Sequence, residues 1–308
     1  MKRILVSLVV LIGGVVGLMA LFPEKVAELS RNSERSKSGL TYKTVVVADE
    51  TWHFLEGGEK DAEVVLLLHG FGTSKDVWTQ FLRPLANDYR VIAPDLPGFG
   101  QSARHPDWNY TLPPQRDRLN DFVTALGLEE FHIVGHSMGG HLAALYTHKY
   151  AAQVLSIALF DSAGVAPLGE SDMQRALANG DNPLLARSPE EFDEMLAIIF
   201  YTKPFIPWPI KGVYVRYTLD HADFNQSVFV SYVNDLDSRL EPILGEINKP
   251  ALIIWGEFDR VIDVTSVDVM RPLLPQANVV IMKDTGHAPQ REHPGATAAH
   301  YLEFVNKY

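Results

Sequence analysis

The chain has 308 residues and a formal net charge of −11 at pH 7. This acidic balance argues against a nucleic-acid-binding protein, because phosphate binding needs clustered Lys and Arg, and also against electrostatic attachment to anionic lipid. The absence of cysteine excludes disulfides, cysteine zinc sites and a cysteine nucleophile, while a hydrophobic content of 46% is ordinary for a folded globular domain.

The first segment has the pattern of a membrane-inserted helix. Lys2 and Arg3 precede an uncharged, largely apolar run over residues 4–22, which as a helix would be roughly 28 Å long, close to the hydrocarbon thickness. No Ala-x-Ala cleavage site follows, so we expect residues 1–23 to be an uncleaved membrane anchor; the alternatives are a cleaved signal peptide, followed by secretion, and a buried core helix. The two basic residues favour a cytoplasmic N-terminus and a periplasmic domain, although further basic residues follow the run.

Residues 24–40 are predicted to be a polar linker, since the stretch SRNSERSKSG at 30–39 has no apolar side chain. Strand-favouring runs at Thr44–Val47 and Trp52–Leu55, joined by turn-prone residues, then predict a hairpin. The folded domain is therefore expected to begin near residue 41.

After the hairpin, continuous apolar runs alternate with helical stretches such as Arg116–Leu126 and Gly140–Tyr150. Runs of this kind are typical of parallel strands that are covered on both faces. The expected strands are Val64–Leu68, Arg90–Ala93, Phe131–Val134, Leu155–Phe160, Ala251–Trp255 and Val279–Met282. The pattern predicts an α/β fold with a mostly parallel, doubly wound sheet that binds its ligands at the carboxyl ends of the strands.

One interval is far longer than an ordinary connection between a strand and a helix. We predict that residues 165–245 form an inserted helical cap between two parts of the core, residues 41–164 and 246–308. The insertion has apolar residues at helical spacing within Pro183–Tyr201, and an apolar, proline-rich stretch at 204–210. The alternative is an ordinary extension of the core.

Ser137 is the candidate nucleophile. It lies in the sequence Gly135-His136-Ser137-Met138-Gly139, between a predicted strand and a predicted helix. This is the context of a nucleophile elbow, a strained turn that presents a serine hydroxyl above the sheet and needs glycines where the strand and helix meet closely. The alternative is a glycine-rich turn with an incidental serine.

A serine nucleophile needs an adjacent base, and His287 is the candidate. It follows the last predicted strand, on a loop that should return to the strand ends. His53 and His300 fall in the predicted hairpin and the final helix, where they are poorly placed. His136 should point away from its neighbour Ser137.

A carboxylate must orient the imidazole and stabilise its cation. Asp259 is the first choice, because WGEFDR at 255–260 follows the penultimate strand. Asp263 and Asp161 remain alternatives. The order Ser, Asp, His along the chain is that of an α/β-hydrolase.

Donors for an oxyanion are expected at the backbone N–H groups of Phe71 and Met138, each worth about 3 kcal/mol of transition-state stabilisation. Phe71 belongs to the sequence HGFG at 69–72, directly after an expected strand. His69, Gly70 and His136 are expected to border the substrate. A second turn, DLPGFGQS at 95–102, is interpreted as structural, with Asp95 holding the loop.

Five stretches carry a resemblance to the α/β-hydrolase superfamily that extends over essentially everything after the predicted linker. They are HGFG (69–72), DLPGFGQS (95–102), GHSMGG (135–140), WGEFD (255–259) and GHAPQREHP (286–294). Within the superfamily the chain is similar to the membrane-anchored monoacylglycerol lipases and bacterial lipases, through SPEEFDEML (188–196) and IIWGEFDRVIDVTSVDVM (253–270).

The resemblance implies a serine hydrolase of lipid-like carboxylic esters whose nucleophile, acid and base fall on Ser137, Asp259 and His287. Hydrolysis of a carbon–carbon bond in ring-fission diketones, or a membrane-tethered binding protein without activity, are the alternatives. The chemistry implies no metal or organic cofactor. The expected partners are a lipid or small-molecule ester and a membrane, with no nucleic acid and no obligatory protein partner.

Overall fold

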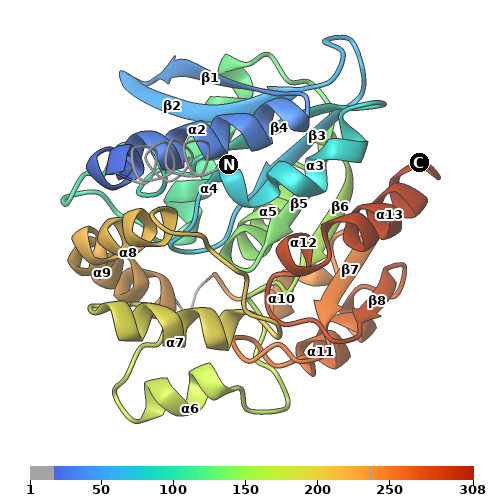
Figure 1. The fold of residues 1–308 in the computed structure, drawn as a ribbon. Helices are drawn as coiled ribbons and strands as arrows, with labels where there is room; N and C mark the ends of the chain where they lie inside the picture. The colour runs from blue at the N-terminus through green and yellow to red at the C-terminus, as the bar shows by residue number, and fades with distance from the viewer. Residues whose placement is uncertain (1–16, 236–237) are drawn as a thin grey trace.

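The structure is a computed structural model that describes residues 17–235 and 238–308 (Figure 1). Most of the predicted membrane anchor, residues 1–16, lies outside the described residues. Within the described part of the chain, no helix is both long enough and apolar enough to cross a bilayer.

A sheet in the order β1-β2-β4-β3-β5-β6-β7-β8 forms the centre of the described chain (Figure 1). β1 (Leu40–Val47) and β2 (Glu50–Gly57) form the predicted antiparallel hairpin, and β2 also pairs antiparallel with β4. The other pairs are parallel. The parallel strands are β3 (Val64–Leu68), β4 (Arg90–Pro94), β5 (Phe131–His136), β6 (Val154–Phe160), β7 (Ala251–Gly256) and β8 (Asn278–Met282). The predicted α/β fold with a mostly parallel sheet is confirmed.

Helices cover both faces of this sheet. α4 (Leu112–Ala125), α5 (Met138–Lys149) and α11 (Ser266–Leu273) contribute buried side chains to one hydrophobic cluster. α3 (Thr79–Leu85) and α13 (Pro294–Val305) contribute to a second cluster on the opposite face. Shorter helical turns are η1 (Lys75–Trp78), η2 (Ala151–Gln153) and α12 (Pro289–Glu292).

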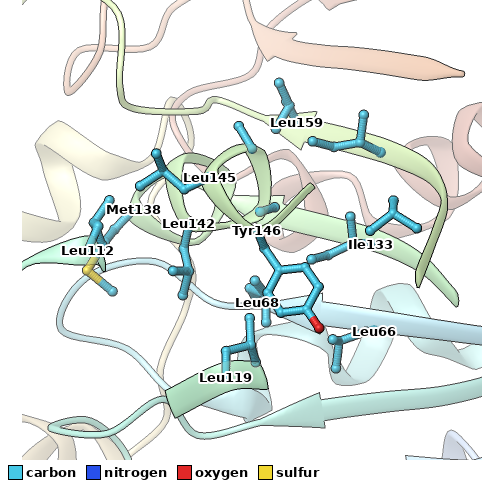
Figure 2. Close-up of a cluster of buried hydrophobic side chains, with 14 of the residues drawn as sticks. Leu66, Leu68, Leu112, Leu119, Ile133, Met138, Leu142, Leu145, Tyr146 and Leu159 are labelled. Atoms are coloured by element: carbon cyan, nitrogen blue, oxygen red, sulfur yellow. The ribbon is translucent and has the colours of Figure 1, made fainter. Parts of the chain in front are cut away.

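Strand β3 shows why the central strands read as unbroken apolar runs. Successive side chains of a strand point to opposite faces. Leu66 and Leu68 therefore belong to the cluster beneath α4 and α5, which Figure 2 shows, whereas Val65 and Leu67 belong to the second cluster. Because both faces are buried, both sets of positions carry apolar side chains.

The stretch expected to be a polar linker instead forms helix α2 (Pro23–Lys37). Proline is favourable at the first helical position, and Lys25–Glu28 and Glu34–Lys37 are ion pairs one turn apart. The polar composition predicts a solvated segment. Arg35 is nevertheless buried, because it pairs with a residue that lies far along the chain. Its guanidinium donates Nε–H and Nη2–H to Asp76 at 2.7 and 2.8 Å.

The interval between β6 and β7 is largely helical. Most of its helices lie together in Figure 1 (yellow-green to gold), whereas Leu240 and Leu244 near its end belong to the hydrophobic cluster of α4, α5 and α11. We call residues 165–245 the helical insertion. It contains α6 (Asp172–Ala178), α7 (Pro189–Ile199), α8 (Ile210–Asp220), α9 (Ala222–Val233) and α10 (Glu241–Leu244). Phe192 of α7 and Val215 of α8 meet in a small apolar cluster within it.

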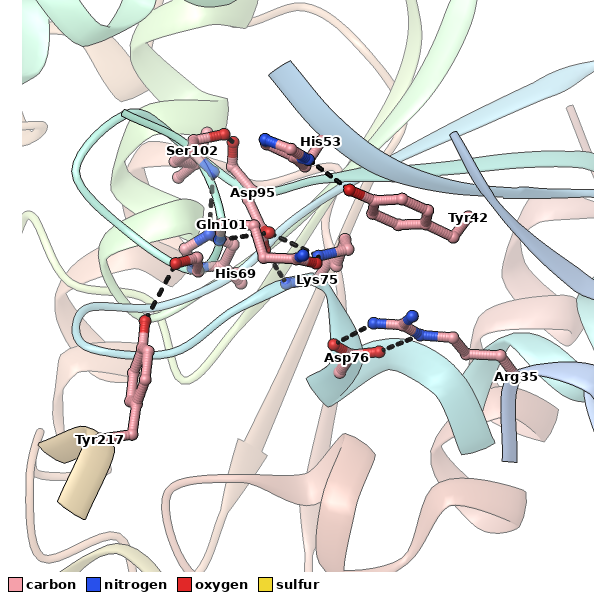
Figure 3. A network of polar contacts seen from close by, with 12 residues as sticks. Arg35, Tyr42, His53, His69, Lys75, Asp76, Asp95, Gln101, Ser102 and Tyr217 are labelled. Atoms are coloured by element: carbon pink, nitrogen blue, oxygen red, sulfur yellow. Dashed lines mark hydrogen bonds and ion pairs between the residues drawn. The ribbon is translucent and has the colours of Figure 1, made fainter. Parts of the chain in front are cut away.

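Asp95 holds its loop, as the sequence predicted, through a buried ion pair with Lys75 (Figure 3). Its Oδ2 atom accepts from Lys75 Nζ at 2.5 Å and from the Gln101 N–H at 2.9 Å, and its Oδ1 accepts from the Lys75 N–H at 2.8 Å. Both side chains are almost completely buried. Breaking such a pair leaves one uncompensated charge inside the protein.

Substituting Lys75→Met is expected to lower the free energy of unfolding by about 3–5 kcal/mol, because the Asp95 carboxylate stays buried without its cation. Lys43→Met is the matched control. Lys43 also pairs with a carboxylate, Glu56, but its side chain is 50% exposed. We expect that control to cost at most about 1 kcal/mol. Urea unfolding of both variants checks this, and equal losses would contradict the role given to the Lys75–Asp95 pair.

Candidate active site

Ser137 occupies a sharp turn between β5 and α5. Its φ and ψ are 55° and −121°, a region that residues other than glycine rarely adopt, and its N–H donates to the Phe160 carbonyl at 2.9 Å. The turn leaves no room for side chains beside it. A Cβ on Gly135 would lie 2.2 Å from the Gly139 carbonyl oxygen, and one on Gly139 would lie 2.3 Å from that of Leu68. The glycines are therefore required by close backbone contact.

The loop after β3 runs directly alongside Ser137. A Cβ placed on Gly70 would lie 3.1 Å from the Ser137 Cβ. The next residue, Phe71, lines the same cavity as Ser137 and Met138. In residues 17–235 and 238–308, the backbone N–H groups of Phe71 and Met138 have no hydrogen-bond acceptor. Two free donors thus lie on the elements that flank the serine.

His69 orders this loop. Its Nδ1–H donates to the Gly70 carbonyl at 2.8 Å, and its Nε2 accepts from the Leu96 N–H at 3.0 Å. The side chain is fully buried, and this burial lowers its pKa, so the imidazole is neutral. Gly70 and His136 lie next to Ser137, but neither they nor His69 are among the described residues that line the cavity.

The structure brings Asp259 and His287 together. His287 Nδ1 donates to Asp259 Oδ2 at 2.8 Å, and both side chains are buried. The other carboxylate oxygen, Oδ1, accepts from the N–H groups of Val261 and Ile262 at 2.8 and 2.9 Å. This arrangement fixes the orientation of the carboxylate. With a proton on Nδ1, the Nε2 atom of His287 is the proton acceptor of the ring.

His136 links this pair to the serine turn. It donates from Nε2 to the His287 carbonyl at 2.6 Å, and the centroids of the two rings are 4.8 Å apart. Burial, reinforced by His287, lowers the pKa of His136 well below its usual value. A neutral His136 next to Ser137 in the chain thus holds the backbone of His287, a contact that sequence reasoning missed.

The two alternative acids have different surroundings. Asp263 accepts from the N–H and hydroxyl of Thr265 at 3.0 and 2.6 Å, and this places it at the start of α11. Asp161 is completely buried and accepts the Gly256 N–H at 2.8 Å. One ligand atom each of Asp161, Asp259 and His287 lie within 4.8 Å of one another. This is compact enough for a cation, but the direct His287–Asp259 hydrogen bond already uses two of the coordinating groups.

Glu292 is a second residue that the sequence did not single out. Its Oε1 accepts from the Gly286 N–H at 2.7 Å and its Oε2 from the Thr202 N–H at 3.0 Å. The His287 N–H in turn donates to the carbonyl of Ile199, the last residue of α7, at 2.7 Å. The loop that carries His287, which we call the histidine loop, is thus hydrogen-bonded to the helical insertion. The only sequence signal was its position in GHAPQREHP.

Ser137 opens onto an apolar cavity of about 190 Å³. The core, the insertion and the loop after Asp259 all contribute to its wall. The lining residues are Phe71, Ser137, Met138, Ala163, Gly164, Val165, Pro167, Met173, Gln174, Leu177, Leu184, Phe229, Tyr232, Val261 and Ile262. A separate, more open depression of about 510 Å³ is lined largely by charged side chains, among them Asp172, Arg175 and Arg260, and lacks Ser137.

Residues 65–300 match the model of the alpha/beta hydrolase family. Lipase 1 of Psychrobacter immobilis is 34% identical over 273 residues, which cover 88% of this chain and 86% of the lipase. Monoacylglycerol lipase ABHD6 of Mus musculus is 29% identical, over 78% of this chain and 75% of its own. Among solved structures, a membrane phospholipase A described as a bacterial virulence factor superposes with a TM-score of 0.90 at 41% identity, covering 100% and 99% of the two chains.

Proposed function

Because the chain belongs to the alpha/beta hydrolase family, we propose that it hydrolyses carboxylic esters of lipid-like substrates with Ser137 as nucleophile, His287 as base and Asp259 as the acid that orients the base. The observation that carries this proposal is an apolar cavity that exposes Ser137 beside the free N–H groups of Phe71 and Met138. His136, the neighbour of Ser137 in the chain, hydrogen-bonds to the backbone of His287 in the buried Asp259–His287 pair.

These groups support the following reaction. His287 Nε2 takes the proton of Ser137 as Oγ attacks the ester carbonyl, and the negative charge develops on the carbonyl oxygen between the N–H groups of Phe71 and Met138. His287 then gives the proton to the leaving alcohol. Water, deprotonated by His287, then attacks the acyl carbonyl, and His287 gives this proton back to Ser137 Oγ as the bond to the acid breaks. Asp259 stabilises the imidazolium in both steps.

The wall of the cavity favours an acyl chain as the bound group. An apolar lining offers little to a charged substrate, since burying an ion without a partner is costly. The similar proteins include lipases and a membrane phospholipase, which supports a lipid ester as the substrate. We further propose that residues 165–245 act as a cap over Ser137 and that the N-terminal segment holds the enzyme at a membrane, with the domain on the periplasmic side. Carbon–carbon hydrolysis is not favoured, because the similar curated proteins are lipases.

A profile of kcat/KM against acyl-chain length tests the proposal. We expect p-nitrophenyl esters and monoacylglycerols to be hydrolysed, and a ring-fission diketone to be inert. Leu177→Trp, which fills part of the cavity, should lower kcat/KM for long acyl chains on the order of tenfold while sparing the acetyl ester. Leu168→Trp is the matched control, because Leu168 is 75% exposed and does not line the cavity. Turnover of the diketone without ester hydrolysis would refute the assignment.

A further inference from the structure

Asp161 is buried beside the proposed acid and base, but the proposed ester hydrolysis gives it no role. It is the first residue after β6, with φ at +44° and an N–H that donates to the Ile254 carbonyl at 2.9 Å. Its Oδ1 accepts the N–H of Gly256, the last residue of β7. A strained backbone and two contacts with β7 therefore fix the position of this carboxyl group.

The second carboxyl oxygen of Asp161, Oδ2, is buried but has no hydrogen-bond partner within the described residues. The nearby carboxylate of Asp259 accepts three hydrogen bonds, from His287 Nδ1 and two backbone N–H groups. A carboxylate has about four lone-pair positions, so one remains open. A single proton between the two carboxyl groups would satisfy both atoms.

The charges around Asp161 favour that proton. Burial, together with the negative charge of Asp259, raises the pKa of Asp161 well above its usual value, and Glu292 acts in the same direction. The Gly256 N–H opposes this shift without cancelling it. The neighbouring His136, whose pKa is lowered well below its usual value, is neutral and supplies no positive charge that would favour an ionised Asp161.

We propose that Asp161 is a positioning residue that stays a neutral acid and donates from Oδ2–H to Asp259, which fixes the carboxylate that orients His287. This rests on the proposed function. The proton stays on Asp161 throughout the reaction, so the proton balance of ester hydrolysis is unchanged. By drawing electron density from Asp259, the donor also limits how strongly Asp259 stabilises the His287 cation.

The test compares Asp161→Asn with Asp161→Leu in the full chain. Asparagine reproduces the neutral acid, since its NH₂ group can donate to Asp259 while its oxygen accepts from Gly256. Leucine has nearly the same size but provides neither group. We expect Asp161→Leu to lower kcat on the order of ten- to a hundredfold and Asp161→Asn to recover most of that loss.

The pH profile of kcat/KM separates this role from a merely structural one. Without a donor, Asp259 stabilises the His287 cation more strongly, so the acid limb of Asp161→Leu should move to higher pH, whereas that of Asp161→Asn should stay in place. If Asp161 were ionised, Asp161→Asn would remove a negative charge near His287, and the acid limb would move to lower pH. That result would overturn the proposal.

A measurement without substrate keeps the proposal testable if Asp161→Leu fails to fold or if the protein hydrolyses no ester. Infrared spectra at pH 7 should show the band of a protonated carboxyl group in the wild type that is lost in Asp161→Asn. Identical spectra would overturn the neutral state of Asp161. Failure of the proposed function would appear separately, as a wild type without ester turnover.

Discussion

Substituting Ser137→Ala is expected to lower kcat for ester hydrolysis by about 10⁵- to 10⁶-fold and to leave the fold intact. In the proposed mechanism the change removes the oxygen that forms the acyl bond, while the N–H groups of Phe71 and Met138 would still stabilise a small amount of direct attack by water. Alanine adds no strain relative to serine at the φ of +55°, because both carry a Cβ. The measurement is kcat with a p-nitrophenyl ester, together with thermal unfolding of the variant.

Ser156→Ala provides the matched control. Ser156 is also a buried serine of the sheet, but it is hydrogen-bonded to His132 and does not line the cavity. Its loss should cost about 1 kcal/mol of stability and little activity. Activity of Ser137→Ala near that of Ser156→Ala would contradict the assignment of the nucleophile.

Asp259→Asn is expected to lower kcat by about 10⁴-fold. The N–H groups of Val261 and Ile262 need an acceptor, so the asparagine oxygen should remain with them and the NH₂ group should face His287 Nδ1. His287 would then carry its proton on Nε2 and could no longer accept the proton of Ser137. The same kinetic assay measures the loss, with a fluorescence or circular-dichroism spectrum to verify the fold.

The control for this substitution is Asp263→Asn, in the same loop. Asp263 bonds to Thr265 and not to His287, so its conversion should change kcat by only a few fold. A larger loss in Asp263→Asn than in Asp259→Asn would move the role of the acid to Asp263.

Much of the architecture could be predicted because its signals are local. The strands around β3 are buried on both faces, so their sequences are continuous apolar runs that end at turns. The turn at Ser137 could also be predicted, since the glycines that it requires are its immediate neighbours along the chain. The hairpin of β1 and β2 could be predicted as well, because its two strand-favouring runs and the turn between them are adjacent in the sequence.

The remaining features depend on partners that are distant in sequence. Arg35 is buried only because Asp76 receives its guanidinium, and a polar composition alone indicated a linker where α2 forms. Glu292 joins the histidine loop to the helical insertion, which no local pattern reveals. The sequence alone leaves Asp161 and Asp259 as alternative acids, but the structure brings both carboxyl groups close to His287. Contacts of this kind arise from the packed fold and not from short motifs.

Labelling with a fluorophosphonate probe tests whether Ser137 is an activated nucleophile. Such a probe phosphonylates a serine only when an adjacent base activates its hydroxyl. We predict one adduct per chain by intact mass, located on Ser137 by peptide mapping, and strongly slowed labelling in His287→Ala. An active enzyme that forms no adduct, or an adduct on another serine, would contradict the assignment of Ser137 as the nucleophile.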